Sequence, residues 1–92
     1  MKANEKAEIL DLMESFRLDE TEALLKKAIH EDSHDDDCHY LLGNLYRKRD
    51  NWQEALQCYA RALELNPESP ARHAREMIVQ IMDFYDKERY NV

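Results

Sequence analysis

The scarcity of residues that reverse the chain constrains this sequence more than any other feature. Its 92 residues contain one glycine and two prolines. A β-sheet needs frequent turns and many β-branched residues, but the chain has two valines and one threonine against many Ala, Leu, Glu, Lys and Arg residues. We therefore expect an all-α fold, and a chain this short supports one domain around a single core.

One stretch, residues 36–69, places eight residues at intervals that suit two helices packed against each other: His39, Leu42, Gly43, Tyr46, Ala55, Tyr59, Ala62 and Pro67. Gly43 lets the two helices approach closely, because it adds no side chain at the crossing. Pro67 ends the second helix. Asp50 and Asn51 supply the turn between the helices, since asparagine tolerates left-handed backbone geometry after a helix.

This spacing resembles the helix-turn-helix unit, about 34 residues long, of tetratricopeptide-repeat (TPR) proteins, with His39 where the pattern begins with tryptophan. The resemblance implies a right-handed superhelical stack of antiparallel helix pairs. It covers nearly the whole chain as one domain, residues 1–92, with a degenerate repeat (2–35), a full repeat (36–69) and a capping helix (70–92).

The flanking units follow from shifting the full repeat by one repeat length, which we call the repeat translation. Toward the N-terminus, Tyr59 translates to Leu25 and the second-helix pattern survives, whereas Gly43 translates to Ile9 and the first-helix signature is lost. Toward the C-terminus, positions that would face a following helix are polar, as at Glu76, which predicts a solvated cap. We expect five helices, near residues 3–16, 19–31, 36–49, 53–65 and 70–89.

The charge balance restricts the classes of partner. The formal net charge is −7, which opposes binding to nucleic acid or to an anionic membrane surface. No apolar run approaches the roughly 18 residues of a membrane-spanning helix, and the first residues lack the apolar segment of a signal peptide. We expect a cytoplasmic protein in which Cys38 and Cys58 are reduced thiols.

The reactive residue types form no recognised catalytic pattern, because a single glycine inside a helix cannot cradle a phosphate and no serine stands in a nucleophile turn. The segment 30–39 does gather three histidines, one cysteine and five carboxylates, and such side chains can ligate a metal. We interpret it as the connection between repeats, where Asp and Ser side chains cap the next helix. We predict no enzyme activity, no cofactor and no metal site, with metal binding through residues 30–39 as a remote alternative.

The first helices of stacked repeats line the concave side, so the repeat translation also predicts a peptide-binding groove. In the full repeat, one stripe of the first helix points away from the second helix. Its residues and their translated equivalents give the candidate site: Lys6, Leu10, Met13, Tyr40, Asn44, Arg47, Lys48, Ile78 and Ile81. An apolar floor with a basic centre suits an extended or helical segment that carries apolar anchors and a carboxylate.

Two other interpretations of this surface stay open. Some TPR domains hold a C-terminal carboxylate with asparagines and basic residues from successive repeats, and the resemblance makes Lys6 and Asn44 part of such a clamp. Leu10 and Ile78 stand where that clamp would have a further asparagine and a further basic residue. Alternatively, Leu10, Ile78, Ile81 and Met82 serve only as helix-to-helix core.

The sequence thus predicts a non-enzymatic protein-protein interaction module, a monomer or weak homodimer, that binds a peptide or protein segment in this groove. The alternative is a small homodimeric assembly protein. Four apolar residues of the C-terminal unit lie partly off its core face and would pair two copies about a two-fold axis: Val79, Phe84, Tyr90 and Val92.

Overall fold

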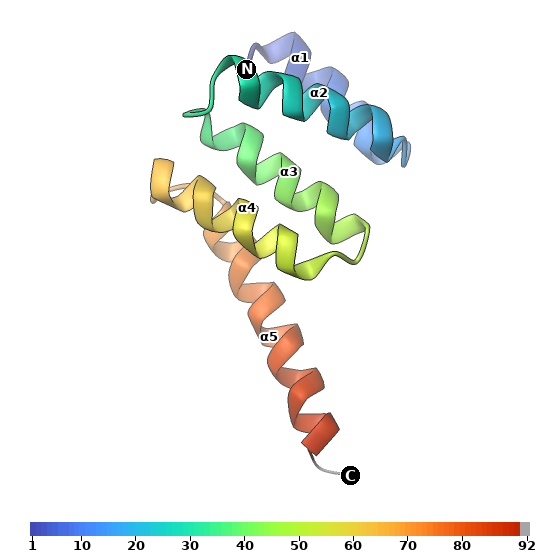
Figure 1. Ribbon diagram of the computed structural model, residues 1–92, viewed down its shortest axis with the longest axis vertical. Helices are drawn as coiled ribbons and strands as arrows, with labels where there is room; N and C mark the ends of the chain where they lie inside the picture. Colours follow the sequence, from blue (N-terminus) through green and yellow to red (C-terminus); the bar gives the residue numbers. More distant parts are fainter. Residues whose placement is uncertain (91–92) are drawn as a thin grey trace.

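A computed structural model of the chain describes the backbone of residues 1–90 and the side chains of residues 1–84. The described residues form α1 (Ala3–Glu14), α2 (Leu18–Glu31), α3 (Asp36–Lys48), α4 (Trp52–Leu65) and α5 (Ala71–Tyr90), and no strand. Consecutive helices pack against each other, and α5 continues beyond the other four (Figure 1). The expected all-α class and the five helices are confirmed, with every helix end within two residues of its predicted position.

The two helix pairs close with the same turn, at positions that the repeat translation relates. Phe16 and Asp50 have left-handed backbones, with φ angles of 57° and 58°. In both turns the next amide donates to the carbonyl five residues earlier at 2.9 Å, the closure that ends a helix on a left-handed residue. The left-handed residue is therefore Asp50 and not Asn51, which instead caps α4 by accepting a hydrogen bond from the Glu54 amide. The degenerate repeat keeps this turn.

Residue sizes at the helix crossing are exchanged between the two pairs. A Cβ atom on Gly43 would lie 2.5 Å from the ring of Tyr59, so that ring fills the space that the glycine leaves. At the corresponding positions of the preceding repeat stand Ile9 and Leu25, both buried. A larger residue on the first helix thus faces a smaller one on the second, which explains how α1 and α2 pair without a glycine.

The last helix packs on α4 with a different face from the one that the repeat translation predicts. In α3, the buried residues that cluster with the preceding helix α2 are Leu41 and Leu45. In α5, the buried residues that cluster with the preceding helix α4 are Ala74 and Ile78. The offset between equivalent positions of α3 and α5 is therefore one residue shorter than the repeat length. The full repeat length would put Arg75 at the buried position of Leu41, and burial of an arginine without a partner is unfavourable. The apolar face of α5 therefore turns toward α4, rotated by about 100° from expectation.

Candidate functional site

Tyr59 of α4 lies at the centre of the predicted site. It is fully buried, its hydroxyl donates a hydrogen bond to Asn44 Oδ1, and its ring centroid lies 6.1 Å from that of Tyr40. Burial raises the pKa of Tyr59 to about 12, and the nearby positive charge of Arg47 opposes this rise because it favours the phenolate. The structure therefore brings Tyr40, Asn44 and Arg47 of α3 together around one side chain.

Two contacts connect α3 to the first helix pair at opposite ends of the predicted stripe. Lys6 Nζ lies 2.9 Å from Asp37 Oδ2, and this hydrogen bond raises the pKa of Lys6. Lys48 Nζ lies 4.9 Å from the ring centroid of Phe16, a cation–π contact. Neither Lys48 nor Arg47 forms an ion pair with another residue in the described part of the chain. Two cations thus lie together without a carboxylate partner there, although the chain as a whole is acidic.

Two predicted ligand contacts are instead core residues. Met13 is 5% exposed and belongs to the cluster that joins α1, α2 and α3, and Ile78 is fully buried beside Tyr59. The prediction that they touch a peptide is wrong, for Ile78 because α5 is rotated. Leu10 and Ile81 remain available, with 41% and 38% of their surface exposed.

The rotation of α5 exposes Met77 and Phe84, which the repeat translation missed, beside Ile81, which it predicted. Together with Trp52 of α4 and Gln80 they line a pocket of about 560 Å³. With the observed offset, Met77 and Ile81 correspond to Asn44 and Lys48 and so continue the α3 stripe. The apolar pattern of the last helix could have identified them. We call the surface formed by these side chains the Arg47 face: Leu10, Tyr40, Asn44, Arg47, Lys48, Met77, Ile81 and Phe84.

The acidic connection and the two thiols show no arrangement for chemistry. Among the residues that the structure describes, no three His, Cys, Asp or Glu side chains gather where they could hold a metal ion. Asp35 caps α3 by accepting a hydrogen bond from the Asp37 amide at 3.1 Å. Burial raises the pKa of Cys38 to about 12 and that of Cys58 to about 11, so both thiols are protonated at neutral pH. No described helix is long and apolar enough to span a membrane.

The helix pairs and their spacing agree with the comparisons with known proteins. The family model of the tetratricopeptide repeat matches residues 37–69. The solution NMR structure of the Bacteroides fragilis protein BF1650 has a TM-score of 0.84 to this structure and 37% sequence identity, over 98% of this chain and 91% of that one. This chain belongs to the tetratricopeptide-repeat family. A comparison with curated proteins finds no match.

TPR proteins generally mediate protein-protein interactions, which directs attention to the Arg47 face. The two residues that resemble part of a carboxylate clamp are both engaged within this TPR stack. Lys6 is paired with Asp37, and the Asn44 side-chain oxygen accepts from Tyr59. Arg47 and Lys48 are therefore the cations of this face that lack a carboxylate partner among the described residues.

Proposed function

We propose that this TPR protein is a non-enzymatic interaction module that binds a segment of a partner protein along the Arg47 face. The observation that carries the proposal is the position of Arg47 and Lys48, two cations without described carboxylate partners, next to the turn that leads into Trp52. Trp52 belongs to the apolar pocket with Met77 and Phe84, which are 44% and 59% exposed. A basic centre beside exposed apolar side chains is typical of a surface that binds a peptide.

The chemistry of this face defines the ligand. A carboxylate of the partner pairs with Arg47 and Lys48, and an apolar side chain enters the pocket beside Trp52. Because the chain carries a net charge of −7, most of its surface opposes an acidic segment, and on this face the carboxylate binds favourably where it meets these two cations. We therefore expect an extended or helical segment that combines an acidic residue with a large apolar one.

A quantitative pull-down from the native cells tests this function with three baits. The wild type is compared with an Arg47→Glu, Ile81→Asp double variant, and with Arg61→Glu as the matched control, because Arg61 is an exposed cation on α4. We expect partners that the double variant loses and the control keeps, with near-identical melting curves of all three baits. Partners that the control loses and the double variant retains would place the binding surface on α4 instead.

Self-association through α5 is the second candidate function. It is favoured by five exposed apolar side chains, between 37% and 59% exposed: Met77, Val79, Ile81, Met82 and Phe84. Of the residues expected there, the side chains of Tyr90 and Val92 lie outside the described residues. Sedimentation equilibrium at increasing concentration tests this function. A dimer mass that reverts to the monomer in Phe84→Asp supports it, and a monomer mass at all concentrations contradicts it.

A further inference from the structure

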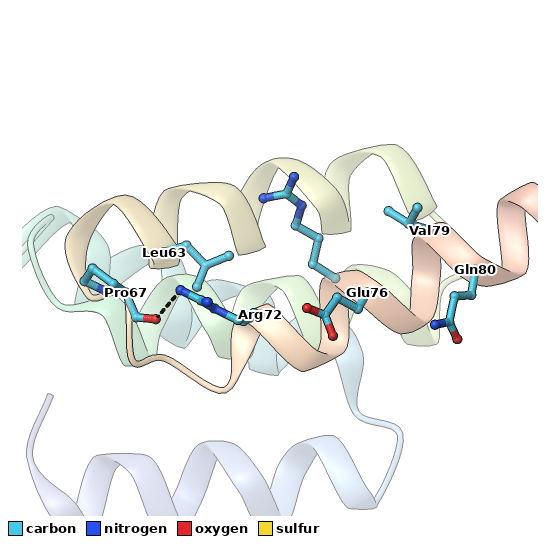
Figure 2. Close-up of a pocket in the computed structure, with 7 residues that line it drawn as sticks. Leu63, Pro67, Arg72, Glu76, Val79 and Gln80 are labelled. Carbon is cyan, nitrogen blue, oxygen red and sulfur yellow. Dashed lines mark hydrogen bonds between the residues drawn. The ribbon is translucent and has the colours of Figure 1, made fainter.

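A second groove lies between α4 and α5 (Figure 2), and we call it the α4–α5 groove. It has a volume of about 570 Å³ and these lining residues: Leu63, Pro67, Arg72, Arg75, Glu76, Val79 and Gln80. Val79 is two residues from Met77 and from Ile81, which is about 200° around the helix axis. The α4–α5 groove therefore lies on the opposite side of α5 from the Arg47 face.

The chain itself contains a helix that occupies the equivalent place one repeat earlier. On α3, Gly43 and Tyr46 are covered by α4, since Gly43 lies against the Tyr59 ring and Tyr46 packs against the same cluster. With the observed offset between α3 and α5, these two positions correspond to Glu76 and Val79, which line the α4–α5 groove. The groove is thus the place on α5 that a further helix would occupy.

The side chains in the groove select a particular kind of helix. Leu63 and Val79 give it an apolar floor, and Val79 is 48% exposed. Arg72 donates a hydrogen bond to the Pro67 carbonyl at 3.1 Å, which holds its guanidinium at one end of the groove (Figure 2). Arg75 forms no ion pair with any residue that the structure describes. Two arginines against one glutamate make the groove positive in a chain of net charge −7.

We propose that the α4–α5 groove binds an amphipathic helix of a partner protein that carries carboxylates opposite Arg72 and Arg75. Its apolar side chains pack on Leu63 and Val79. A helix fits better than an extended strand, because both walls are helices whose backbone groups are already paired, so they offer no sheet edge to extend. This inference does not rest on the function proposed for the Arg47 face, since it is argued from Leu63, Arg72, Arg75 and Val79, although Gln80 lines both the groove and the pocket beside Trp52.

The test uses a synthetic helical peptide with acetylated and amidated ends, leucines at every third or fourth position, and glutamates beside them. A matched peptide has lysines in place of the glutamates. In titrations followed by the amide resonances of the ¹⁵N-labelled protein, we expect the glutamate peptide to shift Leu63 and Val79. Arg75→Glu should weaken its binding by about threefold to tenfold and strengthen that of the lysine peptide, since it replaces an exposed ion pair by a repulsion. Arg75 is exposed, so this variant should fold normally.

Lys27→Glu, which reverses an exposed cation on α2, is the control and should leave the shifts of Leu63 and Val79 unchanged. Shifts confined to Tyr40, Asn44 and Lys48 would instead report binding on the Arg47 face, which separates the two proposals. The proposal is overturned if the glutamate peptide leaves Leu63 and Val79 unshifted, or if the two peptides bind equally well to the wild type. It is also overturned if the groove mediates contact between two copies of this chain. That outcome would appear as a concentration-dependent dimer mass that Val79→Asp abolishes and Phe84→Asp does not.

Discussion

Substitution of Gly43 by alanine tests the packing of the full repeat. The added Cβ would lie 2.5 Å and 2.7 Å from two ring carbons of Tyr59, and unstrained structures essentially never contain such contacts. The ring cannot move away freely, because Tyr59 is fully buried and its hydroxyl is bonded to Asn44. The clash must therefore separate α3 from α4 or displace the ring from its hydrogen bond.

The size of the destabilisation follows from two unfavourable effects and one favourable effect. Overpacking a buried contact costs about 1–3 kcal/mol, and loss of the Tyr59–Asn44 hydrogen bond would cost about 0.5–1.5 kcal/mol more. The higher helix propensity of alanine returns about 1 kcal/mol. We therefore expect Gly43→Ala to lower the free energy of unfolding by about 1–3 kcal/mol. For a domain of this size this corresponds to a fall in melting temperature of about 5–20 °C, and Gly43→Leu should be worse.

Urea denaturation followed by circular dichroism measures the effect, and a second background isolates its cause. In a Tyr59→Leu protein the ring is absent, so Gly43→Ala should be neutral or stabilising there. The N-terminal repeat already combines a large first-helix residue, Ile9, with Leu25. The reasoning is refuted if Gly43→Ala is as stable as the wild type, or if it destabilises both backgrounds equally.

Three further outcomes follow from local contacts. Asp50→Gly should raise the free energy of unfolding by about 0.5–1 kcal/mol, because glycine adopts the left-handed backbone without steric strain; a lower melting temperature would contradict this. The hydrogen bond from Arg49 lowers the pKa of Glu22, so its stabilisation is present above the ordinary glutamate pKa of about 4.3 and is lost as the pH falls through the lower folded value. Glu22→Gln should then reduce the free energy of unfolding at neutral pH by about 0.5–1 kcal/mol, and it should make the fall of that free energy at acid pH smaller than in the wild type. Urea midpoints measured across pH test both effects. Cys38 and Cys58 should react slowly with a chromogenic disulfide at neutral pH until urea unfolds the chain, since burial raises their pKa values; fast reaction of the folded protein would exclude this.

The sequence predicted the helices well because its local patterns agree with the tertiary packing. The positions of Gly43 and Tyr59 identify the full repeat, and the structure places them in contact. The repeat translation also locates the N-terminal pair, where Phe16 adopts the same left-handed turn as Asp50. Even so, the translation cannot show that Asp50, and not Asn51, takes this conformation, because both residue types tolerate it.

The candidate site was predicted less completely, because the residues that α5 contributes to it depend on how that helix is rotated about its axis. The repeat translation placed Ile78 on the exposed stripe and ignored that Arg75 would then be buried. A charge at a buried position is the sequence signal that could have corrected the offset. Met77 and Phe84 were missed as part of this face for the same reason. Tyr40 and Asn44 were expected to point away from the second helix, but both contact Tyr59 of that helix.

Site-specific photo-crosslinking in the native cells tests the central claim, that partners bind along the Arg47 face. A photoreactive amino acid is introduced at Arg47 in one protein and at Gln57, an exposed position of α4, in another. We predict that the protein labelled at Arg47 forms a discrete adduct with a partner through a segment that contains an acidic and a large apolar residue. The protein labelled at Gln57 should form none. Adducts from Gln57 with none from Arg47 would contradict the assignment of this face while leaving the TPR fold intact.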